Sequence, residues 1–94
     1  MEKNINIGDL VVSLAGRDKG KIFLVINVDD KSVFLINGKD RKISKPKRKN
    51  KKHIDRVLVA GEKELAIKIQ KGEIVGNERI RRQIKAQIEK IQED

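Results

Sequence analysis

The sequence predicts a mainly β protein, in which a small β-barrel of four or five short strands is followed by a C-terminal helix. The apolar fraction of 37% is carried by isoleucine, valine and leucine, with two Phe, no Trp and no Tyr, and β-branched residues favour strands. Apolar segments of strand length alternate with turn-forming residues over roughly the first 60 positions. A chain of 94 residues buries only a small core, and barrel closure hides strand edges that a small open sheet exposes.

The first strand is expected at residues 9–14, where apolar residues recur at every second position and predict one better buried face. The alternating residues are Leu10, Val12 and Leu14. A tight, exposed and basic loop follows at residues 15–20. Gly16 and Gly20 are its predicted turn formers, because glycine adopts positive φ without a steric cost.

Two further strands and a hairpin are expected next. Residues 21–28 are apolar and β-branched enough to form a strand buried on both sides, and residues 33–36 form the third strand. Asn37 and Gly38 then predict a two-residue type I′ turn, which requires positive φ twice. The strand that returns from this turn is expected at residues 39–43.

The remaining segments up to residue 76 give weaker signals. Pro46 lacks an amide donor and is expected to end the returning strand. A closing strand is expected from residue 54 to about Gly61. Residues 62–71 alternate like a strand but also place apolar residues on one helical face; helix is the favoured interpretation, and Gly72 ends the element in either case.

A C-terminal helix is expected over residues 78–93, with Asn77 as its N-cap. Isoleucines at i, i+4, i+8 and i+11 form one stripe that either packs on the barrel, the favoured interpretation, or pairs with a partner helix. These are Ile80, Ile84, Ile88 and Ile91. Arginines crowd the positive end of the helix dipole, so a group outside the helix is expected to favour them. The chain therefore divides into a barrel at residues 1–61 and an extension at residues 62–94.

The charge of the chain points to a polyanionic partner. Lys and Arg number 23 against 14 acids, a formal net charge of +9 with a pI near 10.0. Residues 39–52 hold nine of the cations and one acid, so almost all the net charge is local. A solvated loop is the alternative, but dense like charges repel unless a partner neutralises them. Nucleic acid is the expected partner.

Several other classes of function are disfavoured. With no Cys and one His, the chain lacks a disulfide framework and the ligands of a zinc site, and we expect no cofactor and a cytoplasmic location. The longest apolar run, residues 22–26, is too short for a membrane span or a signal peptide. Residues 16–21 fail the P-loop pattern in spacing, and His53 has no nucleophile near it in sequence, so we expect no catalysis.

The composition also narrows the kind of nucleic acid. Proteins that read single strands stack bases on aromatic rings, whereas Phe23 and Phe34 lie inside apolar runs and are expected in the core. The cations are 16 Lys to 7 Arg, and lysine acts as a point charge while arginine makes the fork that reads guanine. These features favour phosphate contacts to a structured RNA, with DNA as a lesser possibility.

Two motifs resemble a known family. Residues 8–21 read Gly-Asp-Leu-Val-Val-Ser-Leu-Ala-Gly-Arg-Asp-Lys-Gly-Lys and are followed by an apolar run to Val28; this segment resembles the KOW motif of ribosomal proteins and transcription elongation factors. Residues 46–54, Pro-Lys-Arg-Lys-Asn-Lys-Lys-His-Ile, look like the basic segment of the large-subunit ribosomal protein fourteen-e family. The resemblance implies an SH3-like β-barrel that binds ribosomal RNA, and the chain is similar to a compact bacterial relative of that family.

The resemblance carries over a set of candidate RNA contacts: Lys19, Lys21, Arg41, Lys45, Lys47, Arg48, Lys49, Asn50, Lys51 and His53. Charge alone adds further candidates in the same two basic segments and on the C-terminal helix: Arg17, Lys39, Lys42, Lys52, Arg81 and Arg82. Asn50 and His53 have an alternative role, which is to order their own loop through hydrogen bonds to backbone.

The sequence therefore predicts a non-catalytic RNA-binding protein that associates with ribosomal RNA or the ribosome, in translation or ribosome assembly. The alternative is a protein-interaction module that docks on the transcription or translation machinery. Salt separates the two, because phosphate contacts weaken strongly with ionic strength and an isoleucine seam does not.

Overall fold

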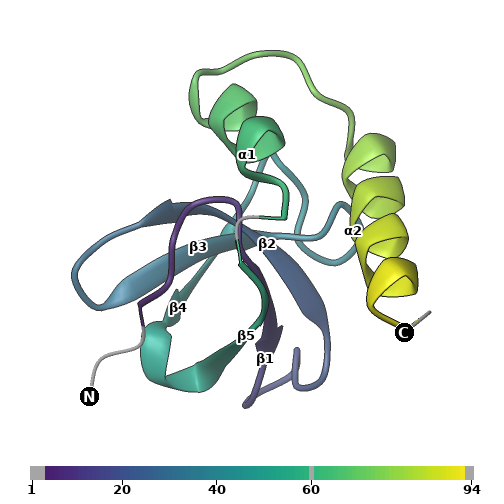
Figure 1. Ribbon diagram of the computed structural model, residues 1–94. Coiled ribbons are helices and arrows are strands. Elements are labelled where there is room, and N and C mark those ends of the chain that lie inside the picture. The colour runs from purple at the N-terminus through teal and green to yellow at the C-terminus, as the bar shows by residue number, and fades with distance from the viewer. Residues whose placement is uncertain (1–3, 60, 93–94) are drawn as a thin grey trace.

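The computed structural model describes residues 4–59 and 61–92. The elements in chain order are β1 (Leu10–Ser13), β2 (Ile22–Val28), β3 (Ser32–Ile36), β4 (Lys47–Asn50), the 3-10 helix η1 (Lys51–His53), β5 (Ile54–Leu58), α1 (Lys63–Gln70) and α2 (Asn77–Gln92). The strands form one antiparallel sheet in the order β4-β3-β2-β1-β5, with β4 and β5 at its two edges. The mainly β class with a C-terminal helix is confirmed (Figure 1). Within the described ranges, no helix is both long and apolar enough to cross a bilayer.

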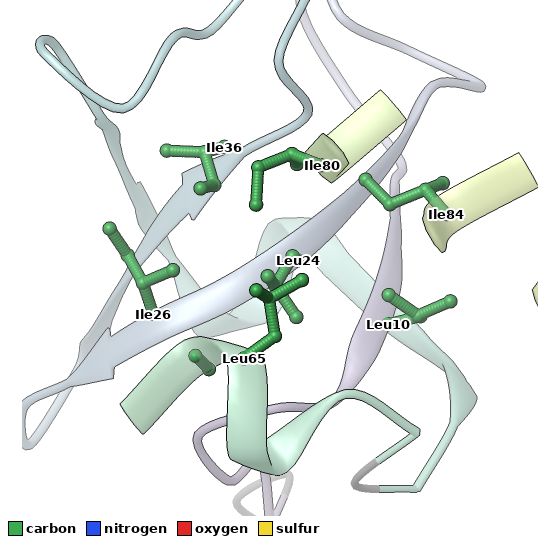
Figure 2. Packing of buried hydrophobic residues seen from close by; sticks show 8 residues of the cluster. Leu10, Leu24, Ile26, Ile36, Leu65, Ile80 and Ile84 are labelled. Atoms are coloured by element: carbon green, nitrogen blue, oxygen red, sulfur yellow. The ribbon is translucent and has the colours of Figure 1, made fainter. Parts of the chain in front are cut away.

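Both faces of the sheet are buried, and each face has its own core. One cluster includes Leu10, Leu24 and Ile36 on the sheet, which pack with Leu65 of α1 and Ile80 of α2 (Figure 2). Because side chains alternate along a strand, neighbouring residues contribute to the second cluster. That cluster contains Ile5, Val11, Phe23, Val25, Val33, Leu35 and Ile54. The helices therefore cover one face, and the second cluster lies on the other.

Burial on both faces corrects the interpretation of the first strand. Val11 and Ser13 are buried, whereas Leu14, which was expected on the better buried face, is 42% exposed. Leu14 lies just beyond the end of β1, where the chain has left the sheet. The expectation for β2 is confirmed, because its residues 23–26 are all buried.

The predicted two-residue hairpin is wrong. Residues 37–46 form a loop, without the strand expected at 39–43, and the next strand is β4. The Asn37 side-chain oxygen accepts the N–H groups of Lys39, Asp40 and Arg41, each at 3.0 Å. The hydrogen-bonded pairing of two hairpin strands would need some of these N–H groups. Because the Asn37 side chain binds them, it stabilises a compact loop instead.

The other turn residues of this segment also act differently than expected. Gly38 has a positive φ of 76°, as its turn-forming role requires. Pro46 precedes β4 rather than ending a strand. Since β4 lies at the edge of the sheet, a proline beside it removes no ladder hydrogen bond that the sheet interior needs.

The segment at residues 62–71 is helical, and it forms α1. Its Leu65 and Ala66 are buried against the sheet. These two neighbouring residues share the apolar face predicted for a helix, not one side of the alternating pattern predicted for a strand. Gly72 follows with a φ of 81° and donates its N–H to the Ile69 carbonyl oxygen at 3.0 Å. A left-handed glycine of this kind commonly ends a helix.

The isoleucine stripe of α2 packs on the sheet over most of its length. Ile80 and Ile84 are buried in the cluster beside the helices, and Ile88 is half-buried against it. Ile91 is 41% exposed. The helix begins at Asn77, whose side-chain oxygen accepts the Ile43 N–H at 3.0 Å. Asn77 thus joins α2 to the loop at residues 37–46. The predicted helix end at residue 93 lies outside the described residues.

Candidate nucleic-acid interface

The loop at residues 14–21 and the loop at residues 37–46 meet at one buried carboxylate. Asp18 is only 5% exposed, and its Oδ2 accepts hydrogen bonds from Arg41 Nε at 3.3 Å and Nη2 at 3.0 Å. These partners lie 23 positions apart in the sequence. A charged group this deeply buried is costly unless it is paired, so the pair holds the two basic loops in a fixed relation.

A second, exposed contact joins the same loops. Lys21 Nζ lies 3.3 Å from Asp40 Oδ1 and 4.0 Å from Asp18 Oδ1. The hydrogen bond from the Asn37 side chain, followed by that from Lys21, holds the pKa of Asp40 below its ordinary value of 3.8. Asp40 is therefore ionised near neutral pH and keeps Lys21 at the junction between the loops.

Strand β4 is attached to this junction through Lys49. Its Nζ donates to Ser13 Oγ at 2.6 Å and to the Ala15 carbonyl oxygen at 2.8 Å. Nearby, the Leu14 N–H donates to the His53 carbonyl oxygen at 2.8 Å. The loop that begins at Leu14 is thus fixed against both β4 and η1.

Helix α2 is attached through its first turns. Arg81 Nη1 donates to the Gly38 carbonyl oxygen, next to the bond between Asn77 and Ile43. A Cβ atom on Gly38 would lie 2.3 Å from the Asn77 carbonyl oxygen. Only glycine therefore permits this close approach of the loop to the helix.

Three further candidate residues make local contacts. Arg48 lies 3.6 Å from Asp29, and both side chains are largely exposed. Lys51 Nζ donates to the Asp30 carbonyl oxygen at 3.1 Å. Asn50 Oδ1 accepts the Lys52 N–H at 3.0 Å and caps η1. The loop-ordering role of Asn50 is therefore present in the structure.

The candidate residues consequently divide into two sets. The positioning set makes the contacts just described: Lys21, Arg41, Arg48, Lys49, Asn50, Lys51 and Arg81. The free set is exposed, and its side chains make no ion pair or hydrogen bond within residues 4–59 and 61–92: Arg17, Lys19, Lys39, Lys42, Lys45, Lys47, Lys52, His53 and Arg82. Nearly all of the free set lies on segments that the positioning contacts fasten together.

Sequence reasoning missed the acids that organise the interface. In the sequence, Asp18 stands out only within the failed P-loop pattern and the segment that resembles the KOW motif, and Asp40 only as the single acid in a basic run. One signal was present in the sequence: each is an isolated acid among cations, a place where an internal ion pair is expected. The partner of each acid depends on the tertiary fold, which the sequence pattern does not reveal.

The described residues hold no group of three or more His, Asp or Glu side chains placed to bind a metal ion. What the interface offers chemically is positive charge on exposed side chains. No model of a known protein family matches the chain, and no curated protein matches it significantly.

Proposed function

We propose that this protein binds structured RNA through phosphate contacts, as a ribosome-associated protein of the cytoplasm. The observation that carries the proposal is the exposed lysines and arginines of the free set, on segments that buried and half-buried contacts hold in place. Because the backbone segments that carry these side chains are already held in place, binding does not have to order the segments, and each phosphate contact releases counterions from the RNA.

The positions of the aromatic residues favour phosphates over bases. Phe23 is 1% exposed, and Phe34 is half-buried against the core. Neither offers the open ring on which single-stranded RNA stacks. Double-stranded RNA is recognised through its shape, phosphates and 2′-hydroxyls, so a folded, largely paired RNA is the substrate class that fits.

A closed SH3-like barrel of the KOW type is part of the same proposal. The two edge strands, β4 and β5, are joined by η1 alone, and Lys49 spans from β4 to the end of β1. In the segment that resembles the KOW motif, Gly16 and Gly20 have φ values of 77° and 87°. These features support the family resemblance and, with it, ribosomal RNA as the target.

The interaction-module alternative has less support. The isoleucine stripe that would form a partner seam is buried at Ile80 and Ile84. What remains exposed on that stripe is Ile91, too small a surface for a helix-in-groove contact, which uses several anchors along one face.

Salt-dependent binding tests the proposal. The affinity for an RNA hairpin, measured by fluorescence anisotropy between about 50 and 200 mM KCl, should give a log–log slope that corresponds to roughly four to eight phosphate contacts at about 0.7 to 0.9 each. Co-sedimentation with ribosomal subunits at low salt, and release at high salt, is expected in parallel. Binding that does not respond to salt would contradict the proposal.

A further inference from the structure

A shallow groove lies between the two basic loops and α2. It has a volume of about 620 Å³, within the range of roughly 300 to 1,000 Å³ that small-molecule sites occupy. One wall comes from residues 20–22 and from the loop that begins at Asn37, and the other wall is α2. It is therefore continuous with the segments proposed to contact RNA.

The inner surface of the groove is apolar. Ile22 at the start of β2 lines it together with Ile84 and Ile88 of α2. Ile22 and Ile88 are half-buried, so part of each side chain is open to the groove. An apolar surface of this kind stabilises the face of a planar ring when the ring is removed from water.

The charged groups of the groove are four cations and two acids. Lys39 belongs to the free set and lines the groove together with Lys85, which is exposed on α2. Arg81 also lines it, with one guanidinium nitrogen fixed by the Gly38 carbonyl oxygen. The acids are Asp40, which is paired with Lys21, and Glu89. The cations outnumber the acids, so the groove favours an anionic ligand.

The groove is formed before any ligand binds. Its loop wall and its helix wall are joined by the Arg81 contact, by the bond from the Ile43 N–H to Asn77, and by the close packing of Gly38 on α2. A preformed site does not lose binding energy to ordering its own walls. Arginine guanidinium groups stack on bases and lysines bind phosphates, and the groove presents both beside an apolar surface.

From this arrangement we infer that the groove binds one unpaired nucleotide of the RNA, with the base against Ile22 and Ile88 and the phosphates near Lys39 and Lys85. The inference rests on the proposed function and deepens it: the preferred RNA is a helix that carries a bulged or flipped-out nucleotide. Its neighbouring phosphates then lie along the two basic loops. Stacking on the fixed Arg81 guanidinium replaces the aromatic stacking that the chain does not offer.

The test compares two hairpin RNAs that differ by a single bulged nucleotide. Wild-type protein should bind the bulged RNA about five- to tenfold more tightly than the fully paired RNA, near the lower end of what base stacking contributes. With 2-aminopurine as the bulged base, binding should change its fluorescence. Lys85→Gln should remove most of the preference for the bulged RNA, and Ile88→Ser should also reduce that preference.

Matched variants on the same helix separate the groove from general charge. Lys90→Gln removes one cation from α2 outside the groove lining, and it should keep the preference for the bulge. Equal binding of both RNAs by wild type, with a steep salt slope, would overturn the groove assignment and leave the proposed function standing. Equal loss of preference in Lys85→Gln and Lys90→Gln would also overturn it. Failure of both RNAs to bind would overturn both proposals.

Discussion

Substitution of Asp18 by Asn separates positioning from charge. The side chain keeps its size but loses the negative charge that binds Arg41 at 3.0 Å. A hydrogen bond to a charged group contributes about 1.5 to 3 kcal/mol. Arg41 is 32% exposed, and solvent screening lowers that contribution. We expect the free energy of unfolding to fall by about 1 to 2 kcal/mol, which lowers Tm by about 4 to 15 °C for a domain of this size.

The effect on RNA binding decides between two explanations. Asp18→Asn raises the formal net charge by one above +9, so long-range attraction alone predicts tighter binding. The positioning account predicts weaker binding, by about three- to tenfold at fixed salt, because Arg41 and its loop are no longer fixed. Anisotropy titrations with an RNA hairpin, well below Tm, measure this change.

Asp30→Asn is the matched control. It makes the same change in charge at an exposed side chain that has no hydrogen-bond or ion-pair partner within the described ranges; only its carbonyl oxygen accepts from Lys51. It should leave Tm unchanged and should leave affinity equal or slightly higher. If Asp18→Asn binds RNA as tightly as Asp30→Asn and has the same Tm, the reasoning about the loop junction is refuted.

Three further predictions test the structure. Gly38→Ala places a Cβ 2.3 Å from a carbonyl oxygen of α2 and should lower the free energy of unfolding by about 2 to 4 kcal/mol. At Gly20 an added Cβ meets open space, so Gly20→Ala should lower it only by the strain of positive φ, about 1 to 2 kcal/mol. Equal urea midpoints for the two variants would contradict this. Because the pKa of Asp40 is lowered in the folded protein, its stabilising effect is present above pH 3.8 and is lost as pH falls below that value. Asp40→Asn should flatten the stability–pH curve there, and parallel curves would count against the contact. Ile84→Asp buries a carboxylate and should lower stability by about 3 to 5 kcal/mol, while Ile91→Asp should lower it by under about 1 kcal/mol. Thermal unfolding and light scattering measure the stability and the association of both variants. If the stripe were instead a seam for a partner helix, Ile84→Asp would stay folded and fail to associate.

The local features of the fold were predictable from sequence. Gly16 and Gly20 have the positive φ expected of them, because the steric freedom of glycine is a property of the residue itself. Residues 62–71 were ambiguous, since both periods fit them, and packing of Leu65 on the sheet decides for helix. The hairpin prediction failed because the Asn37 side chain binds three backbone amides, a contact that the type I′ pattern does not consider.

The division of the cations was not predictable. Lys47 and Lys49 are two positions apart on β4, yet the first is free and the second reaches Ser13 and Ala15. Arg41 depends in the same way on Asp18, from another loop. Sequence patterns report composition and period, whereas these roles depend on partners that only the tertiary fold brings within hydrogen-bond distance.

The central claim is that the free cations, rather than net charge, bind RNA. The decisive measurement is the slope of log affinity against log salt concentration for one RNA hairpin, compared between two quadruple variants of equal charge. The first variant changes four lysines of the free set to Gln: Lys42, Lys45, Lys47 and Lys52. The other variant changes to Gln three exposed or half-buried lysines of the two helices and the exposed lysine that follows α1: Lys63, Lys68, Lys90 and Lys71. The account predicts that the first variant lowers the slope by roughly three to four units and that the second leaves it within about one unit of wild type. Equal slopes in the two variants would contradict it.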